Sequence, residues 1–334
     1  MITRRNFFLT SAAFAAMAMG LSGCGGDSSG EDGAKTVRFG YVDSGASFPN
    51  ELLGVAIDQG FLEENLAEAG YEVELIAFTG AGPAINEAFT SAEIDFATTG
   101  DVPSVLGKSK GIDTTLFGGQ VNFQGAALVV PADSEAETIE DLAGKTVATL
   151  QGSYMHKALI NMLADNGMSL DDIELTNMTS GDAATAVTSG SVDAACVATI
   201  PQAATLLAEG TAKVILNGDD SEDYNGGMYL LGLTSFVEDN PDAIAAIVKS
   251  YIEANEYALA NYDSAIESLA KSGTEADALK SVYPDVVDLN LSAGEELSDN
   301  VVSVSDFLYE NGLSSAEVDP ADWLDASYFE AASA

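Results

Sequence analysis

Strand-like and helix-like segments alternate twice along this chain, and that alternation limits its possible folds more than any other feature. In the first set, the strand candidates lie at 37–42, 73–78 and 94–98, and the helix candidates at 51–59 and 83–91. In the second set, strands at 145–150, 173–177 and 192–197 alternate with helices at 151–166 and 182–189, the last with Asp182 as its cap. Such alternation predicts an α/β fold, in which mostly parallel sheets are flanked by helices.

The two sets also share residues at a constant offset of 98 positions. The identical pairs are Ala88/Ala186, Thr90/Thr188, Ser91/Ser189, Asp95/Asp193, Ala97/Ala195 and Pro103/Pro201. Because these pairs fall in matching helix–turn–strand units, we interpret the chain as two lobes of one architecture.

The lobes are not expected to follow one another as separate beads. Apolar strand candidates at 125–130 and 228–236 lead into and out of the second set, and two such crossings would make a hinge. We therefore predict lobe 1 at 36–122 and 229–334, and lobe 2 at 123–228. Helix candidates after Asn240-Pro241 and at 263–271, 274–282 and 292–310 are expected to pack around lobe 1.

The first residues have the plan of an export signal. Arg4 and Arg5 precede an apolar stretch and then small residues, which resembles a twin-arginine signal peptide over 1–23. Leu21-Ser22-Gly23-Cys24 resembles a lipobox, so we expect Cys24 to carry lipid and 24–35 to form a flexible tether. An ordinary anchor helix with a chance cysteine is the alternative. The protein is thus expected on the extracytoplasmic face of the cell membrane.

Charge and residue types exclude several function classes. The 12 basic and 53 acidic residues give a formal charge of −41, which repels nucleic acids. His156 is the only histidine, no G-x-S-x-G or C-x-x-C motif occurs, and the carboxylates are dispersed. We therefore expect a monomer that is not an enzyme and that binds no cofactor, metal or nucleic acid.

The loops that follow the strand candidates are the expected ligand site, because open α/β sheets bind ligands at the carboxyl ends of their strands. In lobe 1 these loops are 43–48, 79–83 and 100–103, and in lobe 2 they are 151–154, 180–182 and 199–201. Several begin a helix, where free backbone N–H groups can hold an oxyanion. Routine helix capping is the competing interpretation for any single loop.

Several motifs occur in the order found in one family of binding proteins. They are Phe39-Gly40-Tyr41, Thr98-Thr99-Gly100-Asp101-Val102-Pro103, Asp141-Leu142-Ala143-Gly144-Lys145-Thr146-Val147, Gly152-Ser153 and Ser189-Gly190-Ser191-Val192-Asp193-Ala194. With them, the chain resembles the substrate-binding proteins of ABC importers for nitrate, sulfonates and taurine, a family that includes binders of thiamine-precursor pyrimidines. The resemblance implies a two-lobed periplasmic-binding fold with two crossovers. It also implies a small-molecule ligand held between the lobes, and a permease and its ATPase as partners.

The resemblance and the loops together name the candidate ligand-binding residues. They are Asp43, Ser44, Phe48, Gly80, Gly82, Gly100, Asp101, Gln120, Gln151, Gly152, Ser153, Tyr154, Thr199 and Tyr229. Family members often carry an acid after the V-D-A strand, whereas 198–201 here has none, which disfavours taurine. We expect a sulfonate-like or related small ligand. The alternatives are an aromatic or pyrimidine ligand stacked on tyrosines, a sensing partner of a membrane receptor, and an exported enzyme on the same fold.

Overall fold

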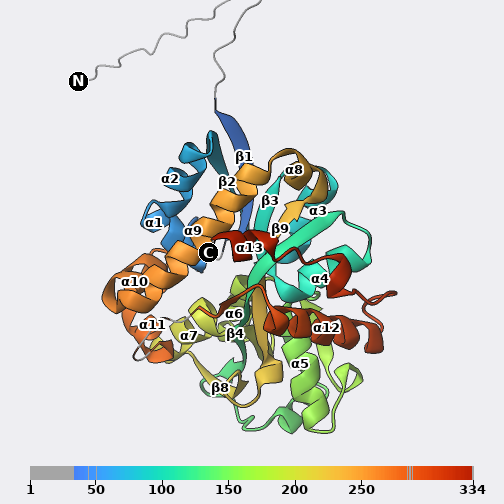
Figure 1. Cartoon of the computed structure of the whole chain (residues 1–334). Coiled ribbons are helices and arrows are strands. Elements are labelled where there is room, and N and C mark those ends of the chain that lie inside the picture. The colour runs from blue at the N-terminus through green and yellow to red at the C-terminus, as the bar shows by residue number, and fades with distance from the viewer. Residues whose placement is uncertain are drawn as a thin grey trace, which may run out of the picture. The chain divides into compact units, whose positions relative to one another are not determined.

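The computed structural model describes residues 34–43, 45–49, 51–283, 285, 287 and 289–332. The predicted signal peptide, Cys24 and the tether up to residue 33 lie outside this part, and the first strand begins at Lys35, inside the predicted tether. The strands form one curled sheet in the order β2-β1-β3-β9-β4-β7-β5-β6, and β8 and β10 also pair with β4. Helices flank this sheet, as the alternation predicts (Figure 1).

The first half of the sheet is built on three parallel strands. They are β1 (Lys35–Val42), β2 (Tyr71–Phe78) and β3 (Phe96–Gly100). The helices between and after them are α1 (Leu52–Asp58), α2 (Phe61–Glu68), α3 (Ala81–Thr90) and α4 (Asp101–Ser109). Helix α2 was not predicted; it is a short helix that buries only Leu62, Asn65 and Leu66. So narrow an apolar stripe is a weak periodic signal.

The second half repeats this plan. Its parallel strands are β5 (Thr146–Thr149), β6 (Glu174–Asn177) and β7 (Ala194–Ala198), and β8 (Ala212–Asn217) pairs antiparallel with β4. Its helices are α5 (Tyr154–Asp165), α6 (Ser180–Thr188) and α7 (Ala204–Ala208), with short turns η1 (Ile139–Leu142), η2 (Leu170–Asp172), η3 (Thr199–Ala203) and η4 (Glu222–Tyr224). The predicted cap of α6 is corrected: Thr179 is its N-cap, and the Thr179 hydroxyl accepts the N–H of Asp182.

Two long antiparallel strands join the halves. β4 (Thr114–Pro131) pairs with β9 (Asn225–Leu233) through its first part and with β7 and β8 through its last part. The register shifts between Gln120 and Gln124. The sheet is therefore mixed, because β4 and β9 add antiparallel partners to each parallel set. The predicted lobe boundaries fall inside β4 and β9, and the lobe division itself stays a prediction.

The C-terminal helices pack mainly on the first half, and α11 also contacts α7 of the second half. They are α8 (Thr234–Asp239), α9 (Pro241–Ala260), α10 (Tyr262–Ala270), α11 (Ala276–Val282), α12 (Glu295–Glu310) and α13 (Ser327–Ala332), with β10 (Leu291–Ser292) and the turn η5 (Pro320–Asp322). Helix α9 packs on α1 and α2 (Figure 1), and Ile244, Ile247 and Tyr251 on it are fully buried. Helix α12 packs on α4 and β4. None of the helices in the described ranges is long and apolar enough to cross a membrane.

The repeat seen in the sequence extends to hydrogen bonding. The Asp95 carboxylate accepts the N–H of Arg38 on β1 at 2.9 Å, and the Asp95 N–H donates to the Arg38 carbonyl. In the second half, Asp193 exchanges the same two bonds with Thr146 on β5. Equivalent aspartates thus tie equivalent strands together, which supports the interpretation of the two sets as copies of one unit.

Candidate functional site

One cavity of about 380 Å³ lies where the parallel strands of both halves end. Its wall contains Val42 at the end of β1, Gly100 at the end of β3 and Ala198 at the end of β7, together with Leu150 just after β5. The N-terminal turns of α3, α5 and α6 contribute Gly82, Tyr154 and Gly181, among others, and α4 begins directly after Gly100. The cavity therefore lies at the strand ends, where ligands of open α/β sheets bind.

The helix starts give this cavity its chemistry. The first N–H groups of an α-helix have no partner within the helix, and each helix N-terminus carries roughly half a positive charge. Four helices begin at the cavity, and the starts of α3, α5 and α6 form a preorganised environment for an anion, whereas the Val102 N–H at the start of α4 is already bonded to the Asp101 carboxylate. The Ser180 hydroxyl oxygen accepts the N–H of Ala198 at 3.0 Å, which leaves its proton for a ligand. Ser153 instead donates its proton to the Leu150 carbonyl at 2.6 Å.

Glycine allows two of these helix starts to approach each other. A Cβ on Gly82 would lie 2.2 Å from Cγ of Pro103, which is closer than atoms pack. Gly82 is in the first turn of α3 and Pro103 is in the first turn of α4. A glycine at position 82 is therefore required for both helix starts to reach the same cavity.

The ionisable side chains of the wall are acidic. Asp43 accepts the N–H groups of Gly45 and Ser47 at 2.8 and 2.9 Å, and Asp182 accepts the Thr179 hydroxyl at 2.8 Å. No lysine or arginine is among the described residues of the wall. A bound anion would therefore be held by backbone N–H groups and hydroxyls, and a single negative charge suits the site better than two.

Apolar side chains make up much of the remaining wall. They are Val42, Ala81, Pro103, Leu150, Met155, Ala198, Ile200 and Met228. Neutral polar groups come from Thr79, Gln124, Thr179, Ser180, Thr185 and Gln202. A cavity of this size with a few placed polar groups is typical of a small-molecule site. The combination suits a ligand with one compact anionic group and a hydrocarbon part.

The structure brings five of the predicted site residues to this cavity. They are Asp43, Gly82, Gly100, Ser153 and Tyr154. Gln151 and Gly152 instead line a separate surface hollow beside α4, and Thr199 lines a larger neighbouring cavity. Neither Gly80 nor Phe48 is part of the cavity wall, and Ser44 lies outside the described residues.

Three predicted site residues are buried and are not among the described residues of the wall. Both carboxylate oxygens of Asp101 accept backbone N–H groups, from Val102 at 2.7 Å and Gly227 at 2.9 Å. Gln120 donates to the Leu289 carbonyl at 2.9 Å, and the Tyr229 hydroxyl donates to Asn300 at 2.6 Å. All three side chains are fully buried. Their hydrogen bonds join segments of the fold, and a role in ligand binding stays a prediction.

Other wall residues were not selected from the sequence. The 180–182 loop was expected near the cleft, yet Ser180 and Gly181 were not chosen. Gln124 and Gln202 carried no signal, because a glutamine in a strand or after a proline has no pattern of its own. The long strand β4 is what brings Gln124 to the site.

Two residues that often act as nucleophile or base, Cys196 and His156, are buried. Cys196 is fully buried, its thiol lies 3.3 Å from the Met155 carbonyl, and burial raises its pKa to about 12. Burial also lowers the pKa of His156 below its usual value, which favours the neutral ring. Within the described ranges no group of three or more His, Cys, Asp or Glu side chains could hold a metal ion. The site is equipped for binding by hydrogen bonds and packing.

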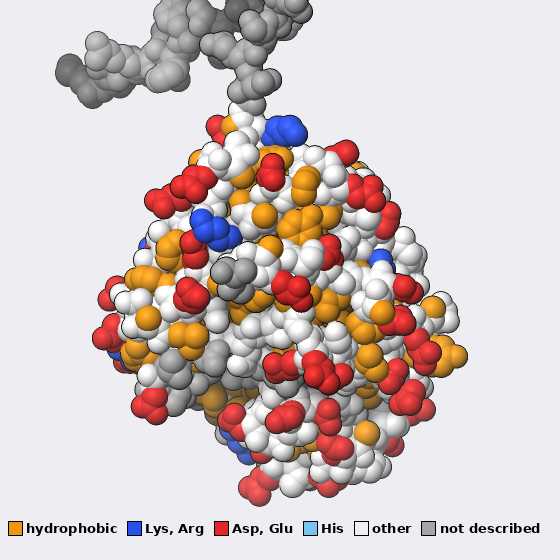
Figure 2. All heavy atoms as spheres, in the orientation of Figure 1, with side chains coloured by type: hydrophobic (Ala, Val, Ile, Leu, Met, Phe, Trp, Pro, Cys, Tyr) orange, Lys and Arg blue, Asp and Glu red, His pale blue; other side chains and the backbone are white. Residues whose placement is uncertain are grey.

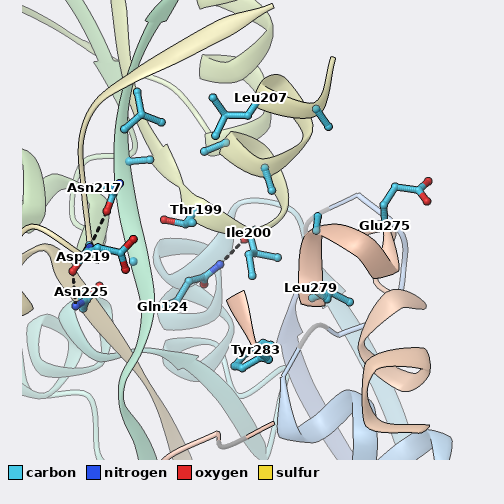
Figure 3. Close-up of a pocket in the computed structure, with 18 of the residues that line it drawn as sticks. Gln124, Thr199, Ile200, Leu207, Asn217, Asp219, Asn225, Glu275, Leu279 and Tyr283 are labelled. Carbon is cyan, nitrogen blue, oxygen red and sulfur yellow. Dashed lines mark hydrogen bonds between the residues drawn. The ribbon is translucent and has the colours of Figure 1, made fainter. Parts of the chain in front are cut away.

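A larger cavity of about 880 Å³ adjoins the candidate site (Figure 3). It is lined by parts of β4, η3, α7 and α11 and by the turn after β8. The starts of α3, α4, α5 and α6 are absent from its described wall. We assign the candidate site to the smaller cavity because the strand ends and helix starts converge there.

Comparisons with known proteins agree with this geometry. The NMT1/THI5 like family model matches residues 52–265. A protein of Escherichia coli (strain K12), provisionally named an aliphatic sulfonates-binding protein, is 28% identical over 242 residues, which are 72% of this chain and 75% of that protein. A Bacillus subtilis (strain 168) protein of the same name is 25% identical over 319 residues, 93% of each chain.

Solved structures match over most of the chain. The periplasmic aliphatic sulphonate binding protein SsuA from Escherichia coli has a TM-score of 0.71 at 26% identity, and the match covers 87% of this chain and 92% of that one. The desulfurization enzyme DszB shares the fold with a TM-score of 0.67 at 18% identity, over 89% of this chain and 98% of that one. The predicted fold class and family resemblance are thus confirmed: the chain has the α/β fold of periplasmic binding proteins and belongs to the NMT1/THI5-like family.

Proposed function

We propose that this chain is an extracytoplasmic binding protein that captures a small organic sulfonate and delivers it to an ABC importer. The observation that carries the proposal is the cavity in which four helix starts surround a partly apolar space without a cationic side chain in its described wall. A sulfonate is a compact monoanion with three acceptor oxygens and a carbon substituent. Its two parts match the two kinds of wall, and the names of the relatives support the same ligand class.

An aromatic or pyrimidine ligand fits this wall less well. Tyr154 is the only aromatic residue in the described wall, whereas Phe48 and Tyr229 are elsewhere. Stacking between two rings, which such a ligand would use, has no pair of rings available there. We therefore rank a sulfonate above a pyrimidine.

We assign no catalytic step to the chain. The likeness to DszB is at 18% identity and concerns the fold. The described thiol, Cys196, is buried with a raised pKa, so little thiolate forms at neutral pH. Transport requires only that ligand binding favours a closed form that the permease recognises. Lipid on Cys24 would hold a monomeric protein near a permease and its ATPase.

Thermal unfolding of the purified chain with a panel of ligands tests the function. Methanesulfonate, ethanesulfonate, taurine, nitrate, sulfate and an aminopyrimidine are compared at equal concentration. A ligand at 100 times its Kd adds about 2.7 kcal/mol of stability. We expect the alkanesulfonates to raise the unfolding temperature and sulfate, a dianion, to have little effect. A shift with the aminopyrimidine alone would contradict the proposal, and stabilisation by no ligand would favour a sensing role.

A further inference from the structure

The larger cavity shares a wall with the candidate site. Gln124 and Ile200 line both spaces, one of about 380 Å³ and the other of about 880 Å³. The Gln124 side-chain amide donates a hydrogen bond to the Ile200 carbonyl, and Figure 3 shows this bond between β4 and η3. One side chain and one hydrogen bond therefore form part of the boundary between the two cavities.

The larger cavity has one apolar wall and one polar wall. Ala204 and Leu207 of α7 and Leu279 of α11 supply the apolar wall. Thr199, Asn217, Asp219 and Asn225 supply the polar wall, and in Figure 3 the Asp219 carboxylate points toward the cavity. An amphipathic space of this kind suits a carbon chain that ends in a polar group.

The polar wall contains an unpaired hydroxyl in a tightly packed place. The Thr199 hydroxyl oxygen is buried and has no hydrogen-bond partner in the described part of the chain. The backbone approaches closely around it, since a Cβ on Gly125 would lie 3.0 Å from this oxygen and one on Gly218 would lie 2.8 Å from Cα of Gly125. Buried hydroxyls are normally paired, and this one is closed off from the cavity, so a ligand group pairs with it only after the Thr199 side chain rotates.

We propose that the larger cavity receives the far end of the ligand, and that Gln124 is the gate through which the carbon chain passes. The inference rests on the proposed function, because it places the sulfonate group at the helix starts. Rotation of the Gln124 amide breaks a single hydrogen bond with Ile200 and opens the shared wall. The ligand class is then a sulfonate with a chain longer than the smaller cavity holds.

Charge restricts the far end of that ligand. Asp219, Glu275 and Asp277 line the larger cavity, and its described wall contains no lysine or arginine. A second anionic group would face the Asp219 carboxylate, which points toward the cavity in Figure 3, whereas an ammonium or hydroxyl end would not be repelled. The preferred ligands are therefore long sulfonates with a cationic or neutral polar end.

Isothermal titration of the purified chain with matched sulfonates tests the inference. Ethanesulfonate reports on the smaller cavity alone, and octane-1-sulfonate, 8-aminooctane-1-sulfonate and octane-1,8-disulfonate report on the larger one. Each buried methylene is worth about fourfold in affinity. We expect the aminooctanesulfonate to bind at least about tenfold more tightly than ethanesulfonate, and the disulfonate to bind at least about tenfold more weakly than the aminooctanesulfonate.

Two variants test where the carbon chain of the ligand lies. Ala204→Phe fills the larger cavity, and Ala208→Phe does the same from an exposed position that tolerates a large side chain. Neither residue lines the smaller cavity. We expect both variants to keep the parent's affinity for ethanesulfonate, which also shows that they are folded, and to lose the advantage of the long chain. Gln124→Ala, which removes the gate, should speed association of the long sulfonates.

The outcomes separate the inference from the proposed function. Tight binding of ethanesulfonate without a gain for any long sulfonate would overturn the inference and leave the function standing. Retention of the long-chain advantage in both phenylalanine variants would also overturn it, because the chain would then lie elsewhere. Failure of every sulfonate to bind would refute the proposed function and the inference together.

Discussion

Two carboxylates that are fully buried show how much the surroundings decide what a residue does. Asp101 looks like a ligand-binding acid in a G-D-x-P turn, yet both of its oxygens are used by backbone N–H groups. Glu51 is 1% exposed at the start of α1 and accepts one hydrogen bond, from the Thr98 hydroxyl at 3.1 Å. Burial raises the pKa of Glu51 to about 8, and the bond from Thr98 opposes that shift only in part.

The raised pKa of Glu51 predicts a pH-dependent stability. The pKa is 4.5 in an ordinary environment and about 8 in the folded chain, so the folded state holds the proton longer. The contribution of Glu51 to the free energy of unfolding is fully present below pH 4.5. It falls by roughly 3–5 kcal/mol as the pH rises to 8. We expect Glu51→Gln to remove this loss and therefore to unfold at higher denaturant than the parent at pH 8.

Denaturant titrations at pH 4.5 and pH 8 check this prediction. Near pH 4.5 the variant and the parent should differ little, because Glu51 is protonated in the folded parent. Glu135 is exposed, so Glu135→Gln is the control and should stay within about 0.5 kcal/mol of the parent at both values. An equal effect of Glu51→Gln at both pH values would show that Glu51 does not titrate in this range.

The two serines at the site should differ in their effect on binding. The Ser180 proton is free for a ligand because the Ser180 oxygen accepts from Ala198, whereas the Ser153 proton is used by Leu150. A hydrogen bond to a charged group is worth about 1.5–3 kcal/mol. We expect Ser180→Ala to weaken sulfonate binding about tenfold or more, and Ser153→Ala to weaken it less. Titration calorimetry measures both, and a larger loss in Ser153→Ala would refute this assignment.

At the scale of elements, the repeat makes matched turns comparable. Ala92 follows α3 and Gly190 follows α6, 98 positions apart, and both have a left-handed backbone with φ of 55° and 71°. Alanine is strained in this conformation and glycine is not. The two halves therefore use one turn geometry with different residues, and the first half carries the strain.

Exchange of the two residues tests that comparison. We expect Ala92→Gly to stabilise the chain by about 0.5–1 kcal/mol and Gly190→Ala to destabilise it by about 1 kcal/mol. A Cβ on Gly190 would meet nothing within 4 Å, so the cost comes from the backbone and not from a clash. Chemical denaturation measures both changes. If both variants changed the stability in the same direction, the backbone angle φ would not be the cause of the change.

At the scale of the whole molecule, acidic charge dominates the surface. The chain carries a formal charge of −41, and Figure 2 shows acidic side chains spread over the face in view with few basic ones among them. Four ion pairs occur in the described part of the chain. Self-repulsion therefore opposes the compact state, and it is screened by salt.

Salt should accordingly stabilise the folded chain. Between about 0.02 and 0.5 M potassium chloride the Debye length falls to a few ångströms. We expect the unfolding temperature to rise by roughly 3–6 °C, which corresponds to one to two kcal/mol. Differential scanning calorimetry measures the shift, and tetramethylammonium chloride controls for specific binding of potassium. A fall in unfolding temperature would show that ion pairs outweigh repulsion.

Local signals in the sequence determined the alternation of strands and helices, the repeat and, through its motifs, the family. Those features depend on neighbouring residues and on hydrophobic periodicity, which a sequence displays directly. The helix predicted after Asn240-Pro241 is α9, and its apolar residues Ile244, Ile247 and Tyr251 are fully buried. The extent of β4 was underestimated because its glycine-containing first part becomes a strand only by pairing with β9.

Only the tertiary structure decided which polar residues face the cavity. Asp101 accepts a hydrogen bond from the N–H of Gly227, 126 positions away, and Gln120 donates one to the carbonyl of Leu289, 169 positions away. Neither hydrogen bond is visible in the local sequence. Long-range contacts of β4 likewise bring Gln124 to the site and to the larger cavity beside it. Hydrophobic pattern is a property of a segment, whereas burial and hydrogen-bond partners are properties of segments brought together by folding.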